Sequence, residues 1–261
     1  MSEVAYDENI ASLYLKYRDQ DLVGKHIEIP HLKQGLGSVT DKTIVDIGCG
    51  TGFHMVLFSD QNPKKQIGVD ISGEQLSRAR QLLEDSKITN FELIENNLGK
   101  NEEILEKIPE NSVDIVFSSY VICHMDNEEM INNYLRVQYK MLKKGGKFVI
   151  YGNNPKNTRQ LDKKIQDIIG ESEIALLDSK TGWVDGAGYH ICLRTGENTS
   201  CPLDDTYWTK ETISKKLTEI GFSNVEIIGM TQKEEALNCF TEEQWEELSK
   251  GEVRHVITAI K

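Results

Sequence analysis

A short apolar run followed by three glycines contains the residues that could do chemistry. It reads Val45-Asp46-Ile47-Gly48-Cys49-Gly50-Thr51-Gly52-Phe53, a predicted strand that ends in an acid and leads into a glycine-rich turn. Glycine adopts the positive φ of a tight strand-to-helix turn, and it lets a ligand come close to the backbone. The amides at the start of the following helix lack partners within the helix and can bind that ligand. The run therefore predicts a nucleoside-binding turn.

The spacing of the glycines distinguishes between two kinds of nucleoside ligand. A dinucleotide fingerprint would place its third glycine at position 53, which is Phe53 here. Asp46 precedes the turn, where a negative charge favours a cationic ligand over a pyrophosphate. The pattern D-x-G-x-G-x-G resembles motif I of the class I S-adenosylmethionine-dependent methyltransferases, whose turn packs against the methionine and ribose portions of the cofactor. The resemblance implies cofactor contacts at Asp46, Gly48, Cys49, Gly50 and Gly52.

Two further strand ends extend this resemblance. Asp70 ends the second predicted strand, 20 residues after Gly50, where a carboxylate can accept hydrogen bonds from both ribose hydroxyls. The alternative role, a helix cap, suits Ser72 better. After the third strand comes Glu95-Asn96-Asn97-Leu98, and the resemblance places Asn97, or else Asn96, at the adenine amino group. Ile71 and Leu98 would then enclose the adenine ring, unless they are ordinary core residues.

The exit of the fourth strand carries a more specific likeness. Residues 118–126 read Ser-Ser-Tyr-Val-Ile-Cys-His-Met-Asp, with a histidine, an apolar residue and an acid at the end. This resembles the small-molecule branch of the family, typified by the ubiquinone/menaquinone C-methyltransferase-like enzymes. Together with later landmarks at 141–148 and 219–222, the resemblance covers roughly residues 40–151 and 208–260. It implies that Ser119 and Tyr120 also contact the cofactor.

Methyl transfer from a sulfonium expels a neutral thioether, so the reaction needs positioning more than an acid. Near-attack geometry can supply about 7–11 kcal/mol, and an aromatic face beside the cation adds roughly 0.5–2 kcal/mol. Tyr14, Tyr17 and Tyr120 are candidates for that face, although a tyrosine stripe on a helix also suits core packing. An oxygen or carbon acid would need a base. His124 is the first candidate, and His190 in an aromatic, glycine-rich stretch is the second.

These residues require a fold that brings the ends of several strands together. Alternating apolar runs and amphipathic stretches predict a Rossmann-like α/β doubly wound sheet of about seven strands, mostly parallel, with a C-terminal antiparallel hairpin. We expect a helical lid at residues 1–39, a cofactor-binding core at 40–151 and 208–261, and a substrate cap inserted at 152–207. A helix is expected at about 158–169 within the cap, and an acidic helix at 241–249.

The composition of the chain limits which partners it can bind. The formal net charge of -12 disfavours a nucleic-acid surface, which needs clustered Lys and Arg. The 261 residues contain no apolar run of membrane-spanning length and no signal-like N-terminus, so we expect a cytoplasmic protein that does not bind a membrane. Five scattered cysteines without a C-x-x-C pair predict neither disulfides nor a metal site. We expect a monomer or a homodimer.

The sequence therefore predicts an S-adenosylmethionine-dependent methyltransferase that acts on a small molecule. Nucleobase amine methylation is disfavoured, because residues 118–121 lack the (Asn/Asp)-Pro-Pro-aromatic motif. Three alternatives remain open: a protein methyltransferase, an NAD-dependent oxidoreductase, and a protein that binds S-adenosylmethionine without transferring its methyl group. The acceptor atom is left open among nitrogen, oxygen, carbon and sulfur.

Overall fold

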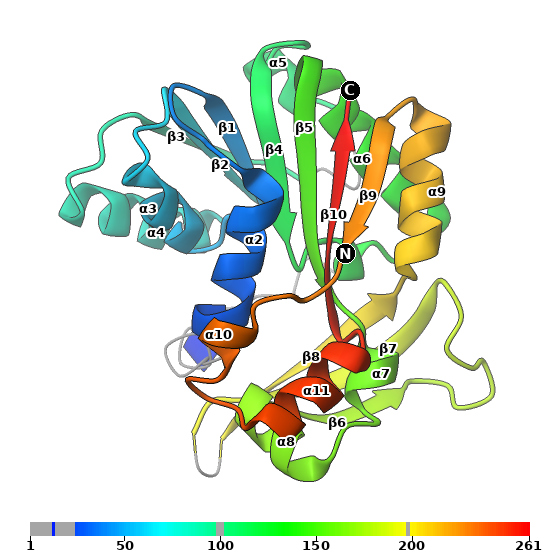
Figure 1. Ribbon diagram of the computed structural model, residues 1–261. Coiled ribbons are helices and arrows are strands. Elements are labelled where there is room, and N and C mark those ends of the chain that lie inside the picture. The colour runs from blue at the N-terminus through cyan, green and yellow to red at the C-terminus, as the bar shows by residue number, and fades with distance from the viewer. Residues whose placement is uncertain (1–11, 14–23, 98–101, 197–198) are drawn as a thin grey trace.

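A seven-stranded sheet forms the centre of the molecule, and a three-stranded sheet lies at one end of it (Figure 1). The computed structural model describes residues 12–13, 24–97, 102–196 and 199–261. The strands of the large sheet are β1 (Thr43–Ile47), β2 (Lys65–Asp70), β3 (Phe91–Glu95), β4 (Val113–Ser119), β5 (Leu142–Asn153), β9 (Ser223–Ile228) and β10 (Arg254–Ile260). Those of the small sheet are β6 (Glu171–Leu176), β7 (Ala187–Arg194) and β8 (Ser200–Tyr207).

The large sheet has the predicted topology. Its strand order is β3-β2-β1-β4-β5-β10-β9, and the first five strands pair in parallel. β10 runs antiparallel to both β5 and β9, so the C-terminal hairpin is confirmed. The carboxyl ends of the parallel strands meet at one edge, which is where α/β sheets bind ligands. In Figure 1 the small sheet lies beneath that edge, below the ends of β4 and β5.

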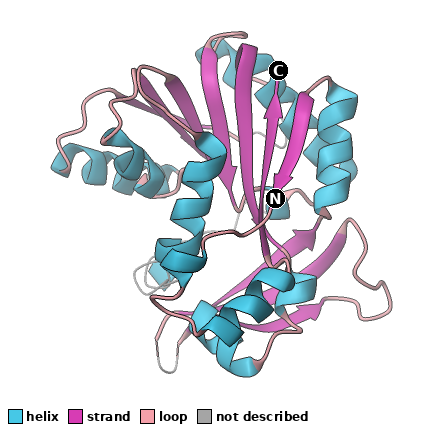
Figure 2. Cartoon of the chain, viewed as in Figure 1, coloured by secondary structure: helices cyan, strands magenta, loops and turns pink. Residues whose placement is uncertain are grey.

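Helices cover both faces of the large sheet (Figure 2). Neighbouring residues of a strand point to opposite faces, so Ile44 packs in the cluster that includes Leu32, while Val45 packs with Leu135 on the other side. The side chains of Ser72 and Asn127 cap two of the helices, as Ser72 was predicted to do. The helical elements are η1 (Gly24–Glu28), α2 (Ile29–Leu36), α3 (Phe53–Ser59), α4 (Gly73–Asp85), α5 (Ile104–Lys107), η2 (Ile122–His124), α6 (Glu128–Met141), α7 (Pro155–Thr158), α8 (Lys163–Ile169), α9 (Lys210–Ile220), α10 (Lys233–Ala236) and α11 (Glu242–Lys250).

The region between β5 and α9 differs from the sequence prediction in two ways. The helix expected at about 158–169 is present but begins later, because α7 ends at Thr158 and α8 runs from Lys163 to Ile169. Asp162 separates them: its side chain accepts a hydrogen bond from the amide of Lys164 and so starts a new helix. The antiparallel sheet β6-β7-β8 was not predicted at all. Residues 152–207 therefore contain a small β-structure of their own.

Two buried contacts attach the inserted region 152–207 to the rest of the chain. Arg254, at the start of β10, forms an ion pair with Glu171, at the start of β6, and both side chains are at most 3% exposed. On the other side, α8 and α11 share an apolar cluster in which Ile165, Trp245 and Leu248 are buried. Ile27 of η1 belongs to the same cluster. The inserted region is thus fixed by an ion pair at β6 and by apolar packing at α8.

The described part of the N-terminal region packs against the core. Leu32 and Leu36 of α2 are buried in the apolar cluster on one face of the large sheet. Pro30 occupies the first turn of this helix, where its missing amide costs nothing.

In the part of the chain that the structure describes, every helix is too short or too polar to span a bilayer.

Candidate functional site

The glycine turn lies at the carboxyl edge of the large sheet, between β1 and α3. Gly48, Gly50 and Gly52 have φ values of +69°, +52° and +79°, all in the left-handed region that favours glycine. The amides of Gly48 and Cys49 donate to the carbonyl of Val69, at 2.7 and 3.1 Å. A Cβ on Gly50 would meet no atom within 4 Å, whereas one on Gly48 would come within 2.5 Å of a side chain. The turn is therefore tight at Gly48 and has open space at Gly50.

Asp70 holds this turn in place. One carboxylate oxygen accepts the amide of Gly50 at 2.9 Å, and the other accepts the amide of Ser72 at 2.9 Å. Burial raises the pKa of Asp70, and the two hydrogen bonds act in the opposite direction. Each carboxylate oxygen has a second lone pair, so the group can still accept hydrogen bonds from a ligand. Asp70 therefore joins the ends of β1 and β2 and presents a carboxylate beside the turn.

Asp46 is a buried acid that lacks a partner. Its side chain is 2% exposed, and neither carboxylate oxygen has a hydrogen-bond partner among the described residues. Burial raises the pKa of Asp46 to about 7, with His54 lowering it and Asp70 raising it further. A buried acid without a partner is costly, and in native structures such a group calls for an explanation. A cationic or hydrogen-bonding ligand at this edge would supply the missing partner.

The third strand brings one more acceptor to the same edge. Asn97 follows β3, and its Oδ1 is buried with no hydrogen-bond partner among the described residues. Ile71 follows Asp70 at the end of β2. The structure therefore places the ends of β1, β2 and β3 together, with Asp46, Asp70 and Asn97 at neighbouring strand ends. Three predicted contacts, Tyr14, Tyr17 and Leu98, lie outside the described residues.

A buried glutamate from η1 joins the exit of β4. Glu28 is 0% exposed, and its Oε1 accepts a hydrogen bond from the hydroxyl of Ser119 at 3.1 Å. The same oxygen lies 3.3 Å from Nε2 of His54 in α3. Tyr120, the next residue after β4, has a φ of +57°, an uncommon value for a residue with a side chain. Its ring packs edge-on against Tyr151 at 5.3 Å.

His124 forms an ion pair with a residue of the small sheet. Nδ1 of His124 lies 2.9 Å from Oδ1 of Asp205 in β8, and both side chains are at most 15% exposed. Burial lowers the pKa of His124, but Asp205 and Asp70 raise it, and the net direction is upward. The hydroxyl of Tyr189 donates to the other oxygen of Asp205 at 3.3 Å. Cys123, His124 and Asp205 bring their ligand atoms within 4.8 Å of one another.

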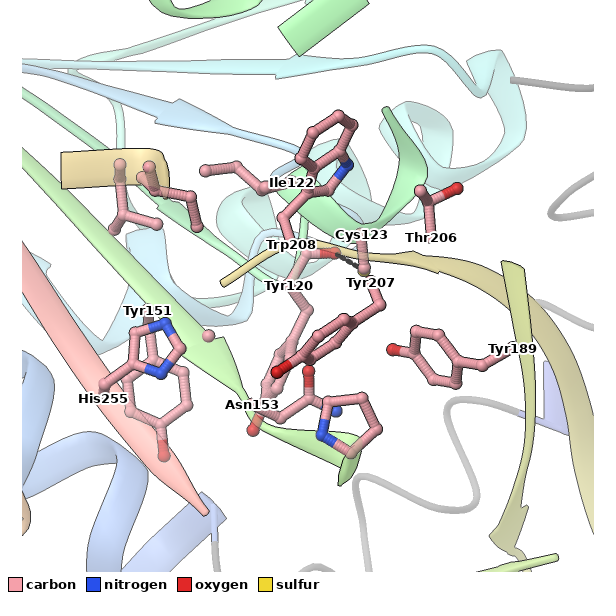
Figure 3. A pocket seen from close by; sticks show the side chains of 14 residues that line it. Tyr120, Ile122, Cys123, Tyr151, Asn153, Tyr189, Thr206, Tyr207, Trp208 and His255 are labelled. Carbon is pink, nitrogen blue, oxygen red and sulfur yellow. Dashed lines mark hydrogen bonds between the residues drawn. The ribbon is translucent and has the colours of Figure 1, made fainter. Parts of the chain in front are cut away.

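A cavity lies between the two sheets, and Ile122 and Cys123, which precede His124, are among the residues that line it (Figure 3). It holds about 400 Å³ of empty space, the part open to solvent included. Five aromatic side chains and one histidine line it. The core supplies Tyr120, Tyr151 and His255, and the inserted region with its following residue supplies Tyr189, Tyr207 and Trp208.

His255 gives this cavity a neutral imidazole. It lies in β10, and its side chain is 5% exposed. Burial lowers the pKa of His255 to about 3, and the positive charge of Lys210 lowers it as well. Nδ1 of His255 is buried with no hydrogen-bond partner among the described residues. The ring is therefore uncharged near neutral pH.

Comparison with known proteins identifies the family. Residues 38–188, more than half of the chain, match the model of a family described as a methyltransferase domain. The chain belongs to this methyltransferase domain family. The prediction of a methyltransferase domain is thereby confirmed.

Individual relatives agree with this assignment at the level of the fold. A crystal structure of an S-adenosylmethionine dependent methyltransferase from Mesorhizobium loti is 20% identical, with a TM-score of 0.62 over 92% of this chain and 100% of that one. An uncharacterized protein of Haemophilus influenzae is 31% identical over 47% of this chain and 48% of its own length. Protein arginine N-methyltransferase 1 of Schizosaccharomyces pombe is 32% identical over 51% of this chain and 34% of its own length. The chain thus spans about half or less of the length of these curated relatives.

Several residues of this candidate site were not predicted from the sequence. Glu28, Asp205 and His255 come from segments where no motif marked them, and each reaches the site only through the fold. The second predicted base, His190, does not line the cavity. Its neighbour Tyr189 does, whereas His190 lies on the opposite face of β7. An alternation of apolar and polar residues along 187–194 is the signal that would have indicated a two-faced strand.

Proposed function

We propose that this methyltransferase transfers the methyl group of S-adenosylmethionine to a small-molecule acceptor, which binds in the cavity between the two sheets. The observation that supports the proposal most strongly is the position of that cavity. It lies at the carboxyl edge of the large sheet and is closed by the inserted segment 152–207, which would act as a substrate cap. Aromatic walls enclosing a few polar groups are typical of small-molecule sites.

The residues at the edge of β1, β2 and β3 fit the cofactor. Asp46 would pair with its cationic portion, since both carboxylate oxygens are buried and accept no hydrogen bond from the described residues. Asp70 would accept the ribose hydroxyls, and Asn97 would accept from the adenine amine. The open space at Gly50 would let the backbone approach the cofactor, with Cys49 and Gly52 shaping the turn. Ile71, Ser119 and Tyr120 would complete the contacts, together with Tyr14, Tyr17 and Leu98.

The chain's own residues would act by positioning and by holding a proton. When bound, S-adenosylmethionine supplies an electrophilic methyl group whose leaving group is a neutral thioether, so no general acid is needed. An acceptor that carries a proton must lose it to a base. His124 would take the proton at Nε2, because Asp205 holds Nδ1 and stabilises the imidazolium. The small sheet would thus both close the cavity and orient the base.

The acidic charge of the chain supports a small-molecule acceptor, as the cavity does. A net charge of -12 is unfavourable for binding RNA or DNA. The arginine methyltransferases and the tRNA U34 carboxymethyltransferases among the relatives match about half of this chain and less than half of their own lengths. The likeness of residues 118–126 to the ubiquinone/menaquinone C-methyltransferase-like branch supports a metabolite acceptor. A monomeric or homodimeric state and a cytoplasmic location remain predictions.

The test is a transfer assay with an unbiased mixture of acceptors. The protein is incubated with S-adenosylmethionine labelled in its methyl group and with a fractionated extract of its source organism. We expect label in the small-molecule fraction, where mass spectrometry identifies the product. Asp70→Asn should abolish the label, whereas Asp178→Asn, which changes an exposed acid that does not line the cavity, should retain it. Label found only in the protein or RNA fractions would contradict the proposal.

A further inference from the structure

The outer face of the small sheet carries a second group of polar side chains, separate from the cavity. In β7, residues 187, 189, 191 and 193 form one face, and His190 and Cys192 lie on the other. Tyr189 and Asp205 contact each other on the inner face, whereas His190 pairs across the strands with Asp204. Glu173 joins this outer group from β6, at an irregularity in the β6–β7 pairing. None of these four outer residues lines the cavity.

The outer group has the geometry of a set of metal ligands. Sγ of Cys192 lies 3.3 Å from Nε2 of His190 and 3.6 Å from Oε2 of Glu173. All three ligand atoms lie within 4.8 Å of one another. Nδ1 of His190 lies 2.7 Å from Oδ1 of Asp204, so the second ring nitrogen is held by a carboxylate. Histidines that bind metals through one nitrogen almost always donate the other to such a partner.

We propose that Glu173, His190 and Cys192 form a binding site for a divalent transition-metal ion of the zinc class, with Asp204 orienting His190. One sulfur, one nitrogen and one oxygen are the donors that Zn²⁺ takes in proteins, and water would fill a fourth position. A mixed set that includes sulfur disfavours Mg²⁺ and Ca²⁺, which prefer oxygen alone. Binding would replace the thiol proton of Cys192 with the metal and release that proton to solvent.

The same residues also resemble a nucleophilic triad, with Cys192 beside His190 and Asp204. The carboxylate of Glu173 argues against that interpretation. Glu173 places a carboxylate 3.6 Å from Sγ of Cys192, and a negative charge there disfavours the thiolate that a nucleophile needs. A reactive cysteine needs the opposite surroundings, positive and partly exposed. A dication would turn the carboxylate from an opposing charge into a ligand.

The proposed ion would be structural. Glu173 belongs to β6, His190 and Cys192 to β7, and Asp204 to β8, so the ion would tie together all three strands. Asp204 precedes Asp205, and the two point to opposite faces of β8. The ion would therefore stabilise the pairing that places Asp205 against His124. The sequence did not indicate this site, since its residues come from three strands and share no ligand motif.

Cobalt binding tests this proposal without any assay of methyl transfer. The full-length chain, freed of metal by a chelator, is titrated with Co²⁺, and the thiolate-to-cobalt charge-transfer absorption is followed. We expect one ion per chain with a thiolate signature, and displacement by Zn²⁺. Cys192→Ser should lose the signature, whereas Cys201→Ser, which alters another buried thiol in the same sheet, should keep it. Absence of binding, or a signature that survives Cys192→Ser, would refute the proposal.

Two exposed positions keep the test decisive if Cys192→Ser does not fold. Asp204→Asn should weaken cobalt binding by about 10–100-fold, the usual effect of removing a partner of a ligating histidine. Glu173→Gln should also weaken it, and Asp178→Asn should not. Unchanged affinity in both Asp204→Asn and Glu173→Gln would overturn the proposal. Loss of the signature in Cys123→Ser would do so too, because it would assign the ion to the group formed by Cys123, His124 and Asp205.

Discussion

Replacing Asp46 with asparagine should stabilise the protein while it weakens cofactor binding. The carboxyl group has its ordinary pKa near 3.8 in the unfolded chain and about 7 in the folded one. Between these values the folded state keeps a proton that the unfolded state has lost. The free energy of unfolding therefore falls as the pH rises from about 4 to about 7. A shift of about three pKa units corresponds to a loss on the order of 4 kcal/mol.

Asp46→Asn removes this loss, but its buried amide has its own cost of about 1–3 kcal/mol when unpaired. We therefore expect the variant to gain about 1–3 kcal/mol at neutral pH in the absence of ligand. For a protein of this size, each kcal/mol raises Tm by about 2–4 °C. Calorimetry should also show weaker binding of S-adenosylmethionine, because the charge that pairs with its cationic portion is gone.

The assay is urea unfolding of the ligand-free wild type and Asp46→Asn, from about pH 5 to about pH 8. The stability difference in favour of the variant should grow as the pH rises and then level off. Asp114→Asn is a control of opposite sign, since Lys143 and the amide of Thr43 hold the pKa of Asp114 below its usual range, despite partial burial. That variant should lose stability at neutral pH. A difference between wild type and Asp46→Asn that does not change with pH would refute the reasoning.

Three further substitutions test other parts of the structure. Gly48→Ala should lower the free energy of unfolding by several kcal/mol, since φ at this position is +69° and the added Cβ would come within 2.5 Å of a valine methyl. Urea unfolding measures this decrease. Asp205→Asn should lower the pKa of His124, because the Asp205 carboxylate is the main group that raises it. An NMR titration of the His124 imidazole measures this pKa, and no downward shift would contradict the prediction. Arg254→Met should cost about 3–5 kcal/mol by leaving Glu171 buried and unpaired, and adding Glu171→Leu should recover much of it. Equal stability of the single and double variants would argue against that pair.

The core was predictable because its signals are local. Each parallel strand is a short apolar run, and Asp46 and Asp70 stand where the run ends and the next turn begins. The glycines at 48, 50 and 52 mark the positive φ values directly. Parallel pairing then follows from the alternation of strands and helices, because parallel strands need crossover connections. The edge to which we assign the cofactor could therefore be assembled from neighbouring residues alone.

The cap was less predictable because its contacts are distant in sequence. Asp205 meets His124 only because β8 folds back against η2, and Arg254 meets Glu171 from the far end of the chain. β6 is a short strand that mixes polar and apolar residues, so its periodic signal is weak. Glu28 looks like an exposed acid in the sequence, yet it is buried between β4 and α3. Such long-range pairs carry no spacing pattern that sequence reasoning can detect.

The assignment of the cofactor to the edge of β1, β2 and β3 is the central claim, and calorimetric titration tests it most directly. The wild-type chain should bind S-adenosylmethionine with one site and should not bind NADH. Asp70→Asn should bind S-adenosylmethionine far more weakly, and Asp178→Asn should bind it as the wild type does. Binding of NADH without S-adenosylmethionine, or undiminished affinity in Asp70→Asn, would contradict the account.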